Sequence, residues 1–97
     1  MLLSIVVPVY NEEENIANFY KAVTDVMSGL TYDYELIFVD DGSSDSSAMI
    51  LREIAFNDKH VKVLLLARNF GHQTALTCGL DYAHGDAVIT MDGDMQH

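Results

Sequence analysis

The sequence predicts an α/β protein with a parallel sheet of about four strands and helices on both faces. Three observations support this fold class. Apolar, β-branched segments of strand length alternate with segments in which apolar residues recur at helical spacing. Polar turns separate the two kinds of segment. Hydrophobic residues make up 49% of the 97 residues, which is enough to build the core of one domain.

An apolar, β-branched run over residues 2–9 is typical of a strand that is buried on both faces, and Pro8 suits the end of such a strand. The next segment predicts a helix over residues 11–27. Asn11 is expected to cap this helix, and the glutamates at positions 12–14 are expected to occupy its first turn, where the helix dipole favours acids. The expected buried face of the helix consists of Ile16, Phe19, Tyr20, Val23 and Met27.

Three further strands and two helices are expected along the rest of the chain. The strands cover residues 34–39, 61–67 and 86–91, and the helices cover residues 46–56 and 74–83. The inward face of the first of these helices is predicted to hold Met49, Ile50 and Ile54, with Leu51 as a further candidate. Because strands alternate with helices, right-handed crossovers place the strands in parallel.

Composition argues against several classes of function. Acidic residues number 15 against 5 basic ones, a formal charge of −10, which opposes binding of nucleic acid through its phosphates. One cysteine permits neither a disulfide framework nor a cysteine zinc cluster and suits a reducing compartment. No targeting segment or apolar run of bilayer length is visible, so we expect a cytoplasmic location. Residues 1–97 are interpreted as one domain, the N-terminal part of a longer protein, because the chain stops directly after a polar cluster.

Polar residues follow every predicted strand. They are Tyr10, Asn11 and Glu12 after the first strand, Asp40 and Asp41 after the second, Arg68 and Asn69 after the third, and Asp92 and Asp94 after the fourth. In open parallel sheets, ligands bind at the carboxyl ends of the strands, near the point where the strand order reverses. The sequence therefore predicts a ligand site at this edge of the sheet.

The acids after the fourth strand suggest a metal site. Asp92 and Asp94 are two residues apart, so both carboxylates project to the same side of extended backbone, and Gln96 can add an amide oxygen. Hard oxygen ligands favour Mg²⁺ or Mn²⁺ over zinc. The alternative is a solvated acidic turn.

The other polar residues leave alternatives open. Asp40 and Asp41 suit a ribose or a base N–H, and they suit a plain turn equally well. Arg68 can bind a base, neutralise a phosphate or pair with a neighbouring aspartate. Tyr10 can stack on a planar ring or simply pack at the strand end.

Four segments together carry a resemblance to a known family. They are VVPVYNEE at residues 6–13, VDDGSSD at 39–45, ARNFG at 67–71 and MDGDMQH at 91–97. In this order they resemble the inverting glycosyltransferases of family 2, which have the Rossmann-like GT-A fold. The loop after the third strand and the ending of the chain are most similar to the polyprenyl-phosphate glycosyltransferases, which act on dolichyl or undecaprenyl phosphate.

The resemblance implies a role for each matching position. The nucleotide pocket would be lined by Pro8, Tyr10, Asn11, Glu12, Asp40, Asp41 and Arg68. Asp92 and Asp94 would be the catalytic Asp-x-Asp motif that binds Mg²⁺ or Mn²⁺ on the donor diphosphate, with Gln96 as a further ligand.

The resemblance also implies partners. The donor would be a UDP- or GDP-linked sugar, and the acceptor a polyprenyl phosphate or a saccharide. The family's acceptor site lies beyond the position at which this chain ends, so we expect these 97 residues to bind donor and metal without transferring sugar. Contact with the cytoplasmic face of a membrane would come only from later parts of the protein.

Two other classes of function fit less well. A nucleotidyltransferase normally has a loop rich in glycine and basic residues after its first strand, which Pro8 to Asn11 do not provide. A non-catalytic, receiver-like metal-binding module would place its acidic pair after the first strand, whereas here the pair follows the second.

Overall fold

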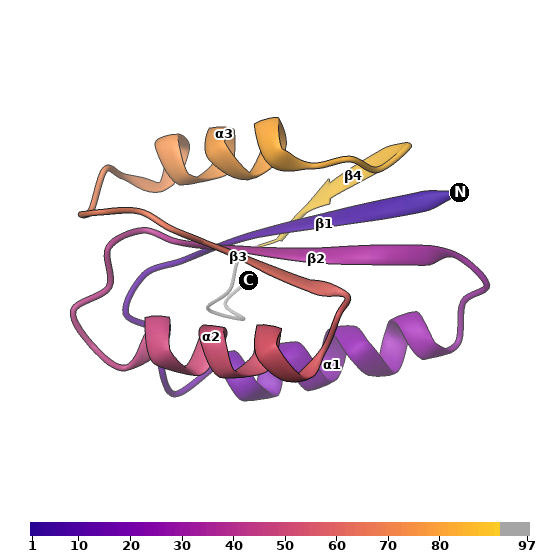
Figure 1. Ribbon diagram of the computed structural model, residues 1–97, viewed down its shortest axis with the longest axis horizontal. Helices are drawn as coiled ribbons and strands as arrows, with labels where there is room; N and C mark the ends of the chain where they lie inside the picture. Colours follow the sequence, from indigo (N-terminus) through magenta and orange to yellow (C-terminus); the bar gives the residue numbers. More distant parts are fainter. Residues whose placement is uncertain (92–97) are drawn as a thin grey trace.

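Strands and helices alternate along residues 1–91, the part of the chain that the computed structural model describes (Figure 1). The strands are β1 (Leu2–Val9), β2 (Asp33–Asp40), β3 (Val61–Leu65) and β4 (Ala87–Thr90). The helices are α1 (Ile16–Ser28), α2 (Ser47–Asn57) and α3 (His72–Tyr82). Every predicted element is present, and the predicted α/β class is confirmed.

The four strands form one parallel sheet in the order β3-β2-β1-β4. From β1 the chain moves to β2 and then β3 on one side, and it returns to place β4 on the other side of β1. The strand order therefore reverses between β1 and β4. At such a switch point the connections leave in opposite directions, and a crevice opens at the carboxyl ends of the strands.

Helices cover both faces of the sheet, as predicted. In Figure 1, α1 and α2 lie together below the sheet and α3 lies above it. Alternate residues of β1 serve the two faces, since successive side chains of a strand point in opposite directions. The core between the sheet and helices α1 and α2 contains Leu3, Ile5, Val7 and Val9. The core between the sheet and α3 contains Val6.

Helix α3 approaches the sheet closely because it carries a glycine at the contact. A Cβ at Gly79 would overlap Cγ1 of Val6 and lie 3.0 Å from Cγ2 of Val39. These two valines, with Ile37 and Ala75, form the small core on this face. The predicted start of this helix at residue 74 is two residues late, since α3 begins at His72.

Helix α1 begins later than the sequence pattern predicts. It starts at Ile16 behind Asn15, so the glutamates at positions 12–14 lie in the preceding turn, and the first turn of the helix holds no acid. The predicted capping role of Asn11 is wrong, because this residue has a left-handed backbone conformation, with φ 51°, and bonds to another loop. The predicted buried face is confirmed, with Tyr20 half-buried.

Helix α2 also differs in one respect. Met49 was expected to face inward, but 65% of its surface is exposed. The fully buried apolar residue of α2 is Leu51, while Ile50 and Ile54 pack at the edge of the larger core. The buried stripe of α2 is therefore centred on Leu51, two residues after Met49.

A buried carboxylate joins the amino ends of β1 and β2 to the turn before β4. Glu35 Oε2 accepts hydrogen bonds from Ser4 Oγ at 2.6 Å and from the His84 backbone N–H at 2.7 Å, and Ser4 Oγ accepts from the Gly85 N–H at 2.8 Å. Burial opposes ionisation of Glu35, but these hydrogen bonds outweigh it and hold its pKa below the ordinary value.

The longest helix described, α1, has 13 residues, whereas a bilayer span needs about 20 apolar ones. Across residues 1–91, no helix combines the length and the apolar character that a membrane crossing requires.

Candidate functional site

Hydrogen bonds join the loops that follow β1 and β2. The Asn11 side-chain oxygen accepts from the Ser44 N–H at 2.8 Å and from the Asp45 N–H at 3.4 Å. The Asn11 N–H donates to Ser43 Oγ at 2.9 Å. Asparagine tolerates the left-handed conformation seen here better than most residues. Asn11 thus lies at the predicted edge of the sheet, where its side chain holds the two loops together.

Glu12 continues the junction between the two loops. Its N–H donates to Ser47 Oγ at 3.0 Å, and its side chain accepts from the Asn15 amide at 2.8 Å. Asp45 receives the N–H groups of Ser47 at 2.9 Å and Glu13 at 3.3 Å. Burial opposes ionisation of Asp45, but its hydrogen bonds from Ser47 and Glu13 outweigh it and lower its pKa.

Asp40 is buried and shapes the turn after β2. Its carboxylate accepts the Ser43 hydroxyl at 2.6 Å and the Ser43 N–H at 3.2 Å. This is the local turn that aspartate commonly forms. The same Ser43 hydroxyl receives the Asn11 N–H, so Asp40 also supports the junction of the two loops.

Asp41 holds the loop between β3 and α3. Oδ1 accepts from the Phe70 N–H at 2.8 Å, and Oδ2 accepts from the Gly71 N–H at 3.0 Å and the Asn69 amide at 3.1 Å. The Asp41 N–H donates to the Val9 carbonyl at 2.8 Å. A carboxylate offers about four lone-pair sites. Among the described residues, Oδ1 accepts one hydrogen bond, from Phe70, so it retains a lone pair for a further donor.

Gly42 allows the β2 loop to touch the β3 loop. Its φ is 71°, and a Cβ there would overlap the backbone of Arg68 and Asn69. Only glycine meets both demands without strain. The sequence analysis named this position only as part of the VDDGSSD segment at residues 39–45.

Two planar side chains are exposed at this edge. The Arg68 guanidinium lies over the Phe70 ring, 4.6 Å from its centroid, in a cation–π contact. Tyr10, at the end of β1, is 47% exposed. This ring contact is none of the alternatives that the sequence left for Arg68, and Tyr10 is open to solvent.

Pro8 explains why β1 parts from β4 before it parts from β2. Within the described residues, β1 pairs with β4 as far as Val6 but with β2 as far as Val9. The Val6 carbonyl accepts from the Met91 N–H at 3.0 Å, and backbone groups two residues apart point to the same side, so Pro8 also faces β4. Proline has no N–H to continue that pairing.

A cavity of about 140 Å³ lies at this parting of the strands. It is lined by Pro8, His72, Leu76, Thr90 and Met91. Two strands and the first two turns of α3 contribute to it, which places it at the switch point of the sheet.

The predicted metal ligands Asp92, Asp94 and Gln96 lie outside the described residues. Residues 1–91 contain no group of three or more histidine, cysteine or acidic side chains that could hold a metal ion. Met91, which directly precedes the Asp-Gly-Asp segment in sequence, lies at the switch point.

The structure thus brings together the residues that the sequence placed after the first three strands, and adds several that it missed. The added residues are Ser43, Ser47 and Phe70, which link or support the loops together with Asn69. The serine-rich turn was a signal that hydroxyl groups would bond to nearby backbone. The sequence placed Asn69 at this edge without showing its bond to Asp41, and nothing in the local pattern marked Phe70, because their partner Asp41 lies in a different loop. The resulting rim offers stacking surfaces and a buried hydrogen-bond acceptor, which suits a planar heterocycle that carries an N–H.

Comparison with known proteins agrees with this geometry. The family description Glycosyl transferase family 2 matches residues 4–97. The uncharacterized glycosyltransferase YkcC of Bacillus subtilis (strain 168) is 52% identical over 93 residues, which cover 96% of this chain and 29% of that protein. The bactoprenol glucosyl transferase of Shigella phage SfV is 47% identical over 96 residues, which cover 99% of this chain and 31% of that protein. The chain spans about 30% of the length of these relatives.

Solved structures give the same result. TarS residues 1–349 of S. aureus, in complex with UDP-GlcNAc, superposes with a TM-score of 0.79 at 27% identity, over 97% of this chain and 27% of that one. The mannosyltransferase PcManGT of Pyrobaculum calidifontis, in complex with GDP-Man and Mn²⁺, superposes with a TM-score of 0.78 at 25% identity, over 95% of this chain and 27% of that one.

Proposed function

Because this chain belongs to glycosyl transferase family 2 and has the GT-A fold, we propose that it is the N-terminal, donor-binding part of an inverting glycosyltransferase. Residues 1–97 would form one domain of a protein about as long as the relatives. The observation that carries the proposal is the joined set of loops at the switch point. A sugar nucleotide is the ligand of the solved relatives TarS and PcManGT, whose folds match this one.

The base would bind at the rim formed by the loops. Tyr10 and Arg68 offer planar groups, one at the end of β1 and one after β3. Asp41 would accept the base N–H through the free lone pair on Oδ1, while the other bonds of its carboxylate hold the β3 loop. Asn11, Glu12 and Asp40 would act by fixing the loops that carry these groups.

The diphosphate would lie nearer the cavity beside Pro8, with a divalent ion. The donor set of Asp92, Asp94 and Gln96 consists of hard oxygen ligands, which fits Mg²⁺ or Mn²⁺. PcManGT was solved with Mn²⁺. When bound, such an ion neutralises charge on a departing nucleoside diphosphate. In that sense Asp92 and Asp94 are the proposed catalytic residues.

In the complete protein, an acceptor oxygen would attack the anomeric carbon from the face opposite the leaving diphosphate, which inverts the configuration. We propose a polyprenyl phosphate as the acceptor, since a relative is a bactoprenol glucosyl transferase. A phosphate oxygen is already anionic, so the reaction does not depend on a strong general base; a saccharide hydroxyl would need one. Sugar transfer would take place at the cytoplasmic face of a membrane. The 97 residues alone would not transfer sugar.

Titration calorimetry tests the donor site. UDP and then GDP are titrated into the complete protein with and without Mn²⁺, and then into the double variant Asp92→Ala/Asp94→Ala. We expect manganese-dependent binding of one nucleotide, weakened at least about tenfold in the variant. The matched control is Asp25→Ala/Asp81→Ala, which removes two exposed acids from α1 and α3 and should bind as the parent does. Folded protein that binds neither nucleotide, or binding unchanged by the double variant, would contradict the proposal.

A further inference from the structure

The outward face of α2 carries two exposed apolar side chains in one line. Met49 is 65% exposed, and Phe56 is 89% exposed, more than any other large apolar side chain in residues 1–91. They lie seven residues apart, which is close to two turns, so they follow one line along the helix. This line is directed away from Leu51, the fully buried residue of α2, and in Figure 1 no described element lies beyond α2 on the side away from the sheet.

Two side chains of opposite charge flank this line. At about 100° per residue, Arg52 lies about 50° to one side of it and Glu53 about 50° to the other. Both side chains are exposed, and across residues 1–91 neither has an ion-pair partner. Met49, Arg52, Glu53 and Phe56 thus form a stripe with an apolar centre, one positive edge and one negative edge, here called the α2 stripe.

We propose that the α2 stripe is an interface between two copies of this protein, with their α2 helices parallel about a two-fold axis. In such a pair, Met49 and Phe56 meet their own counterparts in the second copy. Each edge of the stripe faces the opposite edge of the other helix, so Arg52 lies beside Glu53 of the second copy at both edges. In an antiparallel pair like edges meet, which would place equal charges together. Charge therefore favours the parallel pair.

Charge also favours a second copy over an anionic membrane surface. Such a surface would attract Arg52, but it would repel Glu53 and the formal charge of −10. Two copies repel each other through their net charge as well, but salt screens this repulsion beyond about 8 Å, whereas the two ion pairs act at contact. One pair of helices buries less than the roughly 1,200 Å² of a stable interface, so the expected dimer is weak.

A parallel pair would orient the two proposed donor sites in the same direction. Ser47, the first residue of α2, accepts the N–H of Glu12 from the loop after β1, so the amino end of α2 lies at the donor edge of the sheet. A two-fold axis along α2 brings both donor edges to one side of the dimer. This suits an acceptor held in a membrane, and this consequence alone rests on the proposed function.

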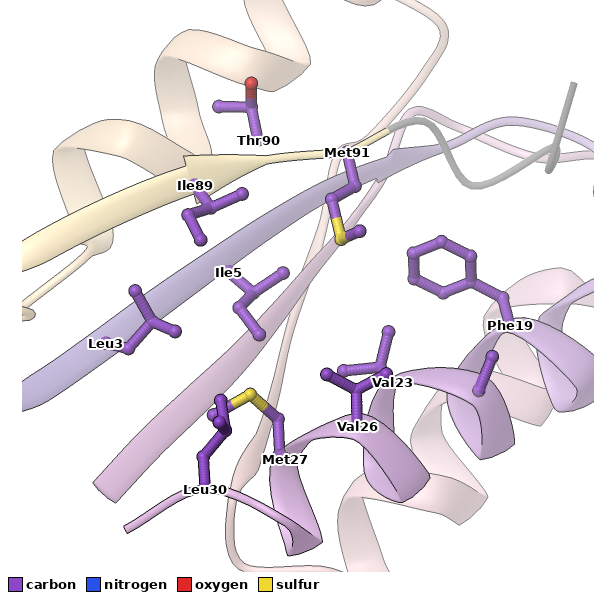
Figure 2. A pocket seen from close by; sticks show the side chains of 11 residues that line it. Leu3, Ile5, Phe19, Val23, Val26, Met27, Leu30, Ile89, Thr90 and Met91 are labelled. Atoms are coloured by element: carbon purple, nitrogen blue, oxygen red, sulfur yellow. The ribbon is translucent and has the colours of Figure 1, made fainter. Parts of the chain in front are cut away.

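Disulfide cross-linking of the complete protein tests the interface. All native cysteines, including Cys78, are replaced by alanine, and a single cysteine is introduced as Met49→Cys or as Val26→Cys. The two positions match in exposure, 65% and 64%, but Val26 lines the groove between α1 and the sheet instead of the α2 stripe (Figure 2). Under mild oxidation we expect covalent dimer to form at least about tenfold faster at position 49, because the parallel helices bring the two cysteines within disulfide range.

Exchange of the two charges tests the orientation of the helices. Arg52→Glu and Glu53→Arg each place like charges at both edges of the interface. Each variant should therefore slow cross-linking at position 49 about fivefold, although the two change the net charge in opposite directions. The double variant Arg52→Glu/Glu53→Arg has opposite charges at both edges again and should cross-link within about twofold of the parent rate.

Equal cross-linking at positions 26 and 49 would overturn the proposal. Single charge variants that cross-link at the parent rate, or a double variant that does not recover it, would overturn it too. If a cysteine variant fails to fold, sedimentation velocity of the charge variants with their native cysteines replaces cross-linking, and a monomer at every concentration of the parent would be decisive against the interface. None of these readouts uses nucleotide, so the proposed donor site can fail in calorimetry while this proposal stands.

Discussion

Asn11 links the loops after β1 and β2 through both its backbone and its side chain. The amide oxygen accepts from Ser44 and Asp45, while the backbone occupies a conformation that costs most residues free energy. The side chain and the backbone contributions can be separated by substitution. Glycine tolerates the backbone but lacks the acceptor, alanine lacks both properties, and aspartate keeps both.

We expect Asn11→Ala to lower the free energy of unfolding by about 2 kcal/mol, from lost hydrogen bonds and the left-handed conformation together. Asn11→Gly should cost about half as much, and Asn11→Asp should stay within about 0.5 kcal/mol of the parent. Urea denaturation at neutral pH measures all three. Equal stability of the alanine and glycine variants would show that the backbone conformation contributes nothing.

The sequence predicted Asn11 at the site but gave it the wrong local role. An asparagine followed by acids and a helical pattern is the usual signal of a helix cap. Its actual partners lie more than thirty residues away, in the loop after β2. For the same reason the sequence placed Asn69 at the site but did not show its partner, Asp41, which lies in another loop. Local patterns identify residue types at strand ends, but not which loop they bind.

Helix α3 depends on a glycine for its close approach to the sheet. We expect Gly79→Ala to destabilise the fold by about 1–3 kcal/mol, because the added methyl overlaps Val6 and forces the helix outward. Alanine is the better helix former by about 1 kcal/mol, so the net loss is smaller than the packing cost alone.

Gly29→Ala is the matched control for this substitution. A Cβ at Gly29 meets only the Val26 carbonyl, at an ordinary 3.6 Å, so the variant should be neutral or slightly more stable. Thermal unfolding of both variants decides the matter. A Gly79→Ala protein as stable as Gly29→Ala would mean that α3 can shift without cost.

Periodicity predicted all seven elements because each strand and helix has a strong apolar pattern. The ends were less predictable, since contacts between elements decide them. α1 begins four to five residues after the predicted start because the preceding residues bond to the β2 loop. Met49 faces solvent because the buried stripe of α2 is centred on Leu51. The four inward candidates in this short helix did not show which of them would meet the sheet.

At the scale of the whole molecule, three carboxylates with lowered pKa values, those of Asp58, Glu35 and Asp45, make the fold sensitive to acid. Burial opposes ionisation of Asp58. Its carboxylate nevertheless accepts hydrogen bonds from the Tyr20 hydroxyl at 2.5 Å and from the His60 backbone N–H at 2.9 Å, and these bonds lower its pKa. Glu35 has a lowered pKa for a similar reason. Near pH 4 the unfolded chain therefore binds more protons than the folded protein does.

Stability from these groups is present above their unfolded pKa values and is lost as the pH falls through the folded values. We expect the free energy of unfolding, measured in urea titrations, to decrease between pH 6 and pH 3. This range includes the ordinary pKa values of 3.8 for Asp58 and 4.5 for Glu35. Asp58→Asn should flatten this decrease, whereas Glu53→Gln, at an exposed position of α2, should leave it unchanged. If the free energy of unfolding of Asp58→Asn fell with pH in parallel with that of the parent, Asp58 would not be a source of the acid sensitivity.

The parallel sheet and its two-sided helix cover followed from alternation of elements in the sequence. The order β3-β2-β1-β4 did not, because hydrophobic patterns say which segments are strands and not which of them are neighbours. Strand-end position was nevertheless enough to predict the edge at which the loops meet. The proposed site residues after β1, β2 and β3 lie there, while the proposed ligands after β4 belong to the part of the chain beyond residue 91.

The contact of Asp41 and Gly42 with the loop after β3 limits which chimeras between family members could exchange a preference for one nucleotide. A chimera that transplants only residues 67–71 would bring loop amides that have no matched carboxylate or close-fitting glycine beneath them. A chimera that transplants only the β2 loop would leave Asn11 facing foreign partners. The three loops after β1, β2 and β3 thus form one structural unit. We expect a chimera to acquire the donor preference of a homologous enzyme only when all three loops are exchanged together.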